Sequence, residues 1–451
     1  MVEFFAVLLF LLTIMFPIFH IINAIYASKG KKQQTTGIIS EKGISILIPC
    51  YNEESIIQTT IDSIEKMPYK AAEYIFINDG STDKTMMALF NLLELKIVYK
   101  DYPLTRLEFM PIKNIYKSEK FPNIMVIDKV NGGKADALNA GIILATHELI
   151  ITLDADSILD DQALSIINEK FEDESIIAAG GMVQILQGSR RSGNKLMPSL
   201  KSKLIVRLQL LEYLRGFYVY KASLARSNAL SIISGAFGVF RKEVLLEVNG
   251  YRKTVGEDID ITLKIQKYLE SKKGSRVVFI PEACCYTEVP ETWKDLYNQR
   301  IRWQKAFTDC LVIYHKDYCK SIFSKKLPFF FLIDSFFVGV VCSYLFLMSI
   351  LPIIFNVGHI NSEFVMLYLI ISTCSNLTYS IVSIWIARKY SFILPVSEKT
   401  KLANTIILDL LLFRFLNILV ICIGTIAYFI KKEGWNKVAR TGRDYSVEQA
   451  S

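Results

Sequence analysis

The sequence lacks the cysteine patterns of a zinc site or a disulfide framework. Eight cysteines occur among its 451 residues, and no two of them form a CxxC pair. Cys310, Cys342, Cys374 and Cys422 lie in or near apolar segments, where zinc ligands and structural disulfides are not expected. Internal repeats and low-complexity segments are also missing, which excludes a repeat architecture.

Charge of neither sign dominates the chain. The 52 basic and 44 acidic residues give a formal net charge of +8, and 21% charged residues accompany 51% hydrophobic ones. This mixture excludes a disordered chain and a bundle embedded wholly in the bilayer, and it is typical of a soluble domain attached to a few membrane spans. Basic residues beside apolar runs mark the cytoplasmic face of a bilayer more often than nucleic-acid binding, so we expect no nucleic-acid partner.

The first apolar run, residues 4–26, is long enough to span a bilayer as a helix. No basic stretch precedes it and no clear small-residue cleavage site follows it, which favours an uncleaved anchor over a signal peptide. Lys29, Lys31 and Lys32 follow at once, and the positive-inside rule places the next segment in the cytoplasm. We therefore expect residues 1–37 to form a transmembrane anchor and a basic linker.

Between residues 38 and 290, short β-rich runs alternate with helical stretches. This alternation predicts an α/β domain with a mainly parallel sheet and flanking helices, placed in the cytoplasm. Ligands of such sheets bind at the carboxyl ends of the strands. The predicted strands end in polar residues: Asn52 and Glu53, Asp79, Asp128, and Asp154 and Asp156.

Beyond residue 290 the chain is first basic and amphipathic and then strongly apolar. We expect interface helices over 291–327, a transmembrane region over 328–432 and a polar tail over 433–451. Within the transmembrane region, the candidate spans are 328–354, 364–387 and about 405–430.

The loops between these spans differ in charge. The loop at 355–363 has no Lys or Arg, whereas 388–401 carries four, which predicts an outside loop followed by an inside one. A third full span would place the basic tail outside. The segment 399–416, which contains Asp409 and Arg414, is therefore our candidate for a re-entrant or interfacial piece.

Asp154 and Asp156 follow a predicted strand directly and are separated by one residue. Two such carboxylates can hold a hard divalent cation whose other ligands are phosphate oxygens. An Asp-x-Asp pair in an ordinary surface loop is the competing interpretation.

Two further polar segments follow predicted strands. Asp79, in INDGSTD, can accept hydrogen bonds from a base or a ribose, although such a sequence also suits a helix-capping loop. Lys134 ends the turn Asn131-Gly-Gly-Lys134, which can approach a phosphate or a base carbonyl. A dinucleotide-binding loop is the rival interpretation, but no GxGxxG follows the first strand.

The pair Glu257 and Asp258 opens a predicted amphipathic helix. A general base at the edge of a site and an N-terminal capping cluster are both open interpretations.

Farther along the chain, Gln299 and Arg302 share a helix face, with Trp303 beside them. An arginine can bind a diphosphate and an indole can stack on a sugar, while a membrane-interface anchor is the alternative. We expect the neighbouring Arg300 and Lys305 to be such anchors.

Taken together, PCYNEES, INDGSTD, NGGKADALNAG, DADS, SGAFGVFR, GEDID and QRIRW occur in an order that resembles the processive glycosyltransferases of family 2. The resemblance is to the membrane synthases of poly-N-acetylglucosamine, hyaluronan, chitin and cellulose, and it covers about residues 44–304. It implies a glycosyltransferase-A-type nucleotide-sugar-binding domain attached to α-helical transmembrane segments. The Gly-Glu-Asp motif, the absence of a cellulose-type gating segment and a longer insertion at about 97–122 depart from cellulose synthases.

The resemblance also implies roles for single residues. Tyr51, Glu53, Asp79 and Lys134 would hold the uridine end of the donor, and Asp154 and Asp156 would hold Mg²⁺ or Mn²⁺ on its diphosphate. Asp258, paired with Glu257, would deprotonate the acceptor hydroxyl. Gln299 and Arg302 would contact the diphosphate, and Trp303 the acceptor sugar. Gln209, Glu212 and Tyr213 match a further family pattern whose role is open, and Trp435 with Arg440 resembles a loop near the pore of hyaluronan synthases.

We therefore expect a plasma-membrane inverting glycosyltransferase that polymerises a UDP-sugar, with N-acetylglucosamine as first choice, into a β-linked polysaccharide and translocates it. Its partners would be the donor, the growing polysaccharide, membrane lipid and an accessory membrane or export subunit. Transfer of one sugar to a lipid or glycan acceptor is the first alternative. An inactive transferase-fold membrane scaffold is the second.

Overall fold

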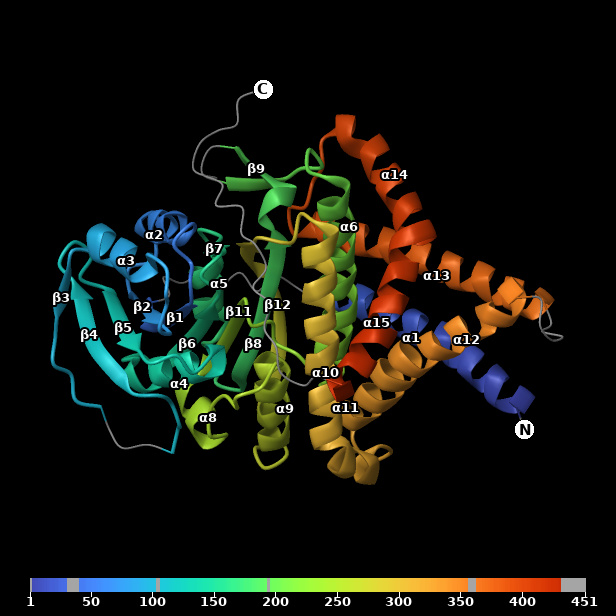
Figure 1. Ribbon diagram of the computed structural model, residues 1–451, viewed down its shortest axis with the longest axis horizontal. Helices are drawn as coiled ribbons and strands as arrows, with labels where there is room; N and C mark the ends of the chain where they lie inside the picture. Colours follow the sequence, from blue (N-terminus) through green and yellow to red (C-terminus); the bar gives the residue numbers. More distant parts are fainter. Residues whose placement is uncertain (1, 31–39, 103–105, 193–194, 356–361, 431–451) are drawn as a thin grey trace. The chain divides into compact units, whose positions relative to one another are not determined.

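The computed structural model describes residues 2–30, 40–102, 106–192, 195–355 and 362–430 (Figure 1). Within these residues the chain forms two compact units. The α/β unit comprises residues 40–197 and 232–289, and the helical unit comprises residues 2–30, 198–231 and 290–430. The segment 198–231 falls inside the range expected for the cytoplasmic domain, yet it packs with the helical unit.

A ten-stranded mixed sheet forms the centre of the α/β unit, in the order β3-β4-β5-β2-β1-β6-β11-β8-β12-β7. Its strands are β1 Ile44–Cys50, β2 Ala72–Asn78, β3 Leu95–Ile97, β4 Ile112–Ser118, β5 Ile124–Lys129, β6 Leu149–Leu153, β7 Ser157–Leu159, β8 Ile176–Ile185, β11 Phe237–Arg241 and β12 Arg276–Thr287. A separate hairpin pairs β9 Ser189–Ser192 with β10 Lys195–Pro198.

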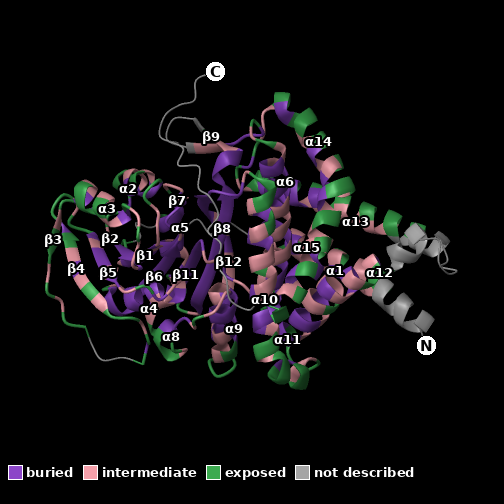
Figure 2. Cartoon of the chain, viewed as in Figure 1, coloured by how far each residue is buried: buried purple, intermediate pink, exposed green. Residues whose placement is uncertain are grey.

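The strands β5-β2-β1-β6 are all parallel, as the alternation of strands and helices predicts, and β8 and β12 form a second parallel pair. Strand β11 runs antiparallel to both β6 and β8, which makes the whole sheet mixed. The run ISILIP is apolar without alternation because β1 is covered on both faces (Figure 2).

Helices flank this sheet: α2 Ile57–Glu65, α3 Thr85–Leu93, α4 Lys134–Leu144, α5 Ala163–Lys170, α8 Lys242–Glu247 and α9 Glu257–Leu269. The parallel strands β1, β2, β5 and β6 all end at the same edge of the sheet. The polar residues that follow these strands are therefore brought to one side of the unit.

The helical unit contains α1 Val2–Ala27, α6 Leu204–Arg215, η2 Gly216–Lys221, α7 Ala222–Arg226, α10 Trp293–Ser321, α11 Lys326–Phe329, η3 Phe330–Val341, α12 Cys342–Phe355, α13 Ser362–Lys389, η4 Val396–Glu398, α14 Lys399–Leu408, η5 Asp409–Phe413 and α15 Arg414–Ile430. Three described stretches are long and apolar enough to cross a membrane: Lys326–Met348, Leu369–Lys389 and Val396–Ile430. They overlap the three predicted C-terminal spans, and Leu11–Ala27 is a shorter apolar helix inside the predicted anchor.

The segment 399–416 is an unbroken part of the helical stretch Val396–Ile430, so it forms no re-entrant hairpin. At 1.5 Å per residue these 35 residues extend for about 52 Å, well beyond a hydrocarbon core of about 30 Å. Part of the stretch must therefore lie outside the core or be strongly tilted. Asp409 forms an ion pair with Arg215, and Arg414 donates a hydrogen bond to the Ser372 carbonyl at 3.1 Å.

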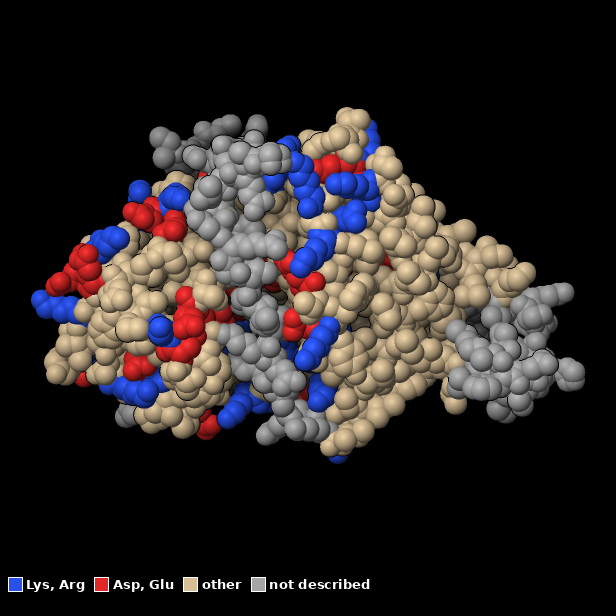
Figure 3. Space-filling model, turned by 45° about the horizontal axis from the view of Figure 1, so that its top comes forward, with Lys and Arg blue, Asp and Glu red and all other residues tan. Residues whose placement is uncertain are grey.

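The helical unit carries few charges around α12 and α13 on the face drawn in Figure 3. The sequence of α12, CSYLFLMSILPIIF, contains no charged residue, and α13 ends with Arg388 and Lys389. A surface of this composition suits contact with lipid chains. The predicted tail, with Trp435 and Arg440, lies outside the described residues.

Candidate functional site

Four of the predicted site residues meet in the α/β unit around the Lys134 side chain. Lys134 begins α4, and its Nζ lies 2.6 Å from Asp154 Oδ1, after β6, and 3.3 Å from Glu257 Oε1, at the start of α9. The Gly235 amide donates to Asp258 Oδ2 at 3.4 Å, and Lys134 also donates to the Gly235 carbonyl at 3.4 Å. The sequence therefore brings together residues from three distant motifs, as predicted.

Gly235, which the sequence motifs did not single out as a site residue, lies inside this cluster. A Cβ added at this position would lie 2.8 Å from Lys134 Nζ. The motif SGAFGVFR could have indicated this position, because its first glycine, Gly235, permits Lys134 to approach the backbone.

The charges in this cluster shift each other's pKa values. Burial by itself lowers the pKa of Lys134, but the carboxylates of Asp154 and Glu257 more than offset it, so the pKa is raised above its usual value. Burial raises the pKa of Glu257, and Asp258 and Asp154 raise it further against the opposing effect of Lys134. Lys134 is therefore held as a cation, suited to the negative charge of a diphosphate.

Asp156 lies deeper than Asp154. Its side chain is buried, and Oδ1 accepts hydrogen bonds from Thr287 at 3.3 Å and Ser157 at 3.4 Å. No group of three or more His, Cys, Asp or Glu side chains in the described part of the chain is arranged to hold a metal ion. Two carboxylates fit a divalent ion shared with a bound diphosphate better than a metal site made by protein alone.

Asp79 is buried, and its carboxylate ties down the loop before α4. Oδ1 accepts from Lys129 Nζ at 2.7 Å and from the Gly132 amide at 3.0 Å, and Oδ2 accepts from the Gly133 amide at 2.7 Å. Lys129 has no exposed surface and also lies 2.5 Å from Asp136 Oδ1. We call Asp79, Lys129 and the two glycine amides the loop latch.

Steric constraints explain why both of these loop positions are glycines. A Cβ on Gly132 would lie 2.3 Å from the Asp136 carboxyl carbon, and Gly133 has a φ of +94°. The sequence did not point to Lys129, because a lysine at the end of an apolar strand carries no distinctive spacing. The contact of Asp79 with a base or ribose stays a prediction.

Tyr51 and Glu53 follow β1 and are half-buried. The Glu53 amide donates to Thr85 Oγ1 at 2.7 Å, and Asn52, which has a φ of +56°, accepts from the Thr82 amide at 2.7 Å. The loop after β1 is thus tied to the loop after β2, which carries Asp79.

In the helical unit, Gln299, Arg302 and Trp303 lie on α10. Gln299 is buried, Arg302 is half-buried and Trp303 is 41% exposed. The expected membrane-anchor role of Arg300 is wrong, because this side chain is buried. It donates to Gln299 Oε1 at 3.1 Å and its guanidinium lies 4.1 Å from the centre of the Trp303 ring.

Arg300 is in turn held by α6, which gives a structural role to Gln209 and Glu212, two residues of the pattern whose role was open. Arg300 Nη2 donates to Glu212 Oε2 at 2.6 Å. Gln209 has no exposed surface and donates to the Pro290 carbonyl at 2.8 Å, just before α10. The two helices therefore position the predicted diphosphate- and sugar-binding side chains together.

Two family models match the chain, and together they cover more than half of it. "Glycosyl transferase family 2" matches residues 45–103, which include Tyr51, Glu53 and Asp79. "Glycosyltransferase like family 2" matches residues 114–306, which include the predicted site from Lys134 to Trp303.

Curated relatives include poly-beta-1,6-N-acetyl-D-glucosamine synthases of staphylococci. The protein of Staphylococcus epidermidis is 31% identical over 313 residues, which is 69% of this chain and 63% of the relative. That of Staphylococcus aureus strain COL is 29% identical over 310 residues, which is 68% of this chain and 64% of the relative. The matches thus span less than two thirds of the length of these relatives.

Among solved structures, a mannosyltransferase from Pyrobaculum calidifontis, in complex with GDP-Man and Mn²⁺, aligns with a TM-score of 0.52. The alignment covers 96% of this chain and all of the other at 16% identity, which supports the fold alone. The motif order, the sheet, the two family models and the staphylococcal relatives agree, and the chain belongs to glycosyltransferase family 2.

Proposed function

We propose that this protein is a membrane-embedded inverting glycosyltransferase that builds a β-linked polysaccharide from a UDP-sugar. The observation that carries the proposal is the cluster of Lys134, Asp154, Glu257 and Asp258 at one edge of the sheet. N-acetylglucosamine is the proposed sugar, supported by the similarity to the staphylococcal poly-beta-1,6-N-acetyl-D-glucosamine synthases.

In this proposal Asp258 is the general base. Its Oδ1 accepts from the Ile259 amide at 2.9 Å, while the contact of Oδ2 with the Gly235 amide is long, at 3.4 Å. The acceptor hydroxyl oxygen attacks the anomeric carbon, the bond from that carbon to the UDP oxygen breaks, and the hydroxyl proton passes to Asp258. One direct displacement inverts the anomeric configuration. Glu257 faces Lys134, so we assign it to positioning that cation beside the reacting groups.

The remaining predicted residues bind the donor and the acceptor. Tyr51, Glu53 and Asp79 are proposed for the uridine end, Lys134, Gln299 and Arg302 for the diphosphate, and Trp303 for the acceptor sugar. Mg²⁺ or Mn²⁺ held by Asp154 and Asp156 would neutralise charge on the leaving diphosphate.

For the cell, we propose a multi-pass plasma-membrane protein with residues 38–327 on the cytoplasmic side, where UDP-sugars are made. Lys389 Nζ lies 3.1 Å from Ser28 Oγ, so the ends of α13 and α1 meet at one basic position. Translocation through the region 328–432, with or without an accessory export subunit, belongs to the same proposal.

The test is to incubate purified protein in membranes with a panel of UDP-sugars and to digest the product with linkage-specific hydrolases. We expect UDP-N-acetylglucosamine to give a polymer that a hydrolase of β-linked N-acetylglucosamine degrades. A product with one added sugar would favour the non-processive alternative. Donor binding without any transfer would favour the inactive scaffold.

Metal removal provides a second test. In this proposal two acidic side chains, Asp154 and Asp156, bind the metal, so EDTA should remove the metal readily and abolish turnover. Addition of Mg²⁺ or Mn²⁺ should restore turnover. Initial rates measured before and after the addition check this. Full turnover in EDTA would remove the metal from the mechanism.

A further inference from the structure

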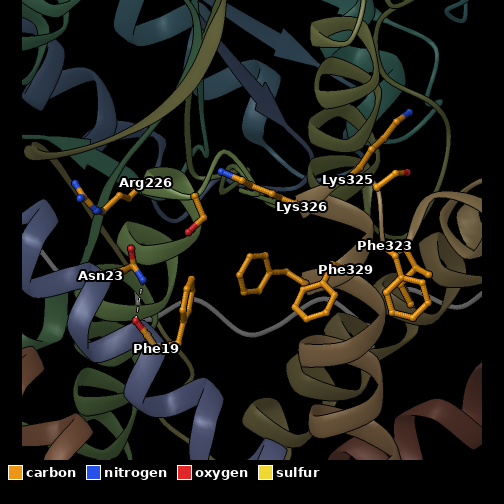
Figure 4. Close-up of a pocket in the computed structure, with 11 residues that line it drawn as sticks. Phe19, Asn23, Arg226, Phe323, Lys325, Lys326 and Phe329 are labelled. Atoms are coloured by element: carbon orange, nitrogen blue, oxygen red, sulfur yellow. Dashed lines mark hydrogen bonds between the residues drawn. The ribbon is translucent and has the colours of Figure 1, made fainter.

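A cavity of about 800 Å³ opens within the helical unit, away from any residue that the proposed reaction uses. Three segments line it: the last turns of α1, the end of α7, and the stretch from Ile322 to Phe330 that connects α10 to the first C-terminal span (Figure 4).

The polar side of the cavity is basic. Arg226, Lys325 and Lys326 line it, and all three side chains are exposed. In the part of the chain that the structure describes, no carboxylate lies within ion-pair distance of Arg226 or Lys326. Figure 4 shows these two side chains flanking the cavity, whereas Lys325 extends away from it. Two cations that no described carboxylate balances favour an anionic occupant on this side of the cavity.

The other side of the cavity is aromatic. The rings of Phe19 and Phe330 lie 5.2 Å apart, and those of Phe329 and Phe330 lie 5.5 Å apart. Figure 4 places Phe19 and Phe329 on the opposite side of the cavity from the Arg226 head group. A cavity with cations on one side and rings on the other suits an amphiphile better than a small soluble anion.

The cavity lies where two apolar helices reach their polar ends. Asn23 is in the last turns of the apolar helix Leu11–Ala27, and Lys326 is the first residue of the apolar stretch Lys326–Met348. Phe323, which also lines the cavity, is 91% exposed. Aromatic and basic residues at the ends of spans lie at the level of lipid headgroups.

A buried polar group fixes the walls of the cavity. His20 Nδ1 lies 2.9 Å from Ser223 Oγ on α7, and its Nε2 lies 2.9 Å from Asp334 Oδ2 on η3. The histidine is one residue from Phe19, and these bonds join α1 to α7 and to η3, which begins at Phe330 of the lining. The cavity therefore depends on packing within the helical unit, and not on a loose surface loop.

We propose that this cavity binds an anionic phospholipid. The lipid phosphate lies between Arg226 and Lys326, and an acyl chain follows the Phe19, Phe329 and Phe330 rings. Basic pockets between membrane helices recognise such headgroups through charge-assisted hydrogen bonds. The inference is independent of the sugar that the protein transfers.

The experiment compares the full-length protein, the double variant Arg226→Gln/Lys326→Gln and the control Lys320→Gln. Lys320 is exposed on α10 and does not line the cavity. Each protein, in detergent, is titrated with a fluorescent phosphatidylglycerol, and in parallel with the matching phosphatidylcholine. Since each basic residue contributes about 1 kcal/mol to binding of an anionic lipid, the double variant should bind phosphatidylglycerol about 30-fold more weakly.

The control should bind like the parent protein, and phosphatidylcholine should bind weakly to all three. Inorganic phosphate as competitor separates the two sources of the anion, because a lipid site should resist displacement by phosphate alone. Equal phosphatidylglycerol affinity in the double variant and the control would overturn the proposal. Equal affinity for both lipids, or full displacement by inorganic phosphate, would overturn it as well. Thermal unfolding of each variant verifies that these exposed changes leave the fold intact.

Discussion

Asp258 and Asp79 are both carboxylates of the α/β unit, but their surroundings suit them to different tasks. Asp258 is half-buried beside Lys134 and Glu257, and the contact of its Oδ2 is long. Asp79 is buried, and both its oxygens accept hydrogen bonds within the loop latch. Substitutions at the two positions should therefore affect different steps.

Asp258→Asn keeps the shape of the side chain but cannot accept the proton. We expect turnover to fall by about 10²–10⁴, the usual cost of a missing general base, with UDP affinity nearly unchanged. Asp79→Asn should instead weaken UDP binding, because an amide cannot accept all the hydrogen bonds that hold the loop. Initial rates and UDP titration calorimetry on both variants measure the contrast. If Asp258→Asn loses UDP affinity as severely as Asp79→Asn, the base assignment is wrong.

Glu257 should give the stability of the protein a distinct pH dependence. Burial, with the nearby Asp258 and Asp154, raises its pKa in the folded state. The folded protein then binds this proton more tightly than the unfolded chain. Its contribution to stability is fully present below about pH 4.3, the pKa of an unfolded glutamate, and is lost as the pH rises through the folded-state value.

Glu257→Gln, which cannot titrate, should lack this decline in the same pH window. Melting temperatures of the parent and the variant across that window measure the difference, with Glu54→Gln, an exposed position, as the matched control. Parallel curves for all three proteins would show that Glu257 titrates normally.

At the scale of elements, α6 and α10 are joined in the helical unit through Arg300. Glu212 on α6 holds Arg300, and Arg300 holds Gln299 and lies against the Trp303 ring. Arg300 is thus a positioning residue for the proposed acceptor site. A lysine at this position keeps the charge but cannot make both hydrogen bonds and the ring contact.

Arg300→Lys should shorten the polysaccharide and increase hydrolysis of the donor to free sugar, because Trp303 loses its support. Loss of hydrogen bonds to a charged group should also lower the stability by about 1.5–3 kcal/mol. Product length and free sugar, measured well below the melting temperature, separate positioning from unfolding. Glu212→Gln should reproduce the shift, and Lys316→Ala, exposed on the same helix, should not. A parental product from Arg300→Lys would refute the positioning role.

Sequence patterns predicted the elements in which burial determines the order of apolar and polar residues. The apolar run of β1 predicted a buried strand, and the polar residues after β1, β2 and β6 lie at one edge of the sheet, as expected for parallel strands. Such patterns did not reveal side chains whose role depends on partners far away in the sequence. Lys129 and Arg300 look like ordinary basic residues, and their roles come from Asp79 and Glu212, 50 and 88 residues distant.

At the scale of the whole molecule, the sequence predicted one continuous cytoplasmic domain over 38–290, but residues 198–231 pack with the helical unit. The sequence did not assign α6 and α7 to the helical unit, because their mixture of polar and apolar residues is compatible with either unit. Their partners, such as Asp409 for Arg215, lie near the other end of the chain.

The orientation of the molecule in the membrane can be tested at Ser81, in the loop after β2. We expect a cysteine introduced there, on a background without other reactive thiols, to be protected from impermeant thiol reagents in intact cells. Permeabilised cells, in which it should react, provide the control. Ready labelling in intact cells would contradict the cytoplasmic placement and the access to cytosolic UDP-sugar.

The loop latch has a consequence for how tightly a donor can bind. Because Asp79 and Lys129 hold the loop Asn131–Lys134 through contacts within the chain itself, its conformational entropy is lost during folding and not during binding. Ordering four backbone residues costs about 4–8 kcal/mol. The lower figure alone, about 4 kcal/mol, separates micromolar from millimolar affinity. If Lys134 binds the donor as proposed, the buried Lys129 would thus help to set the donor concentration at which the protein works.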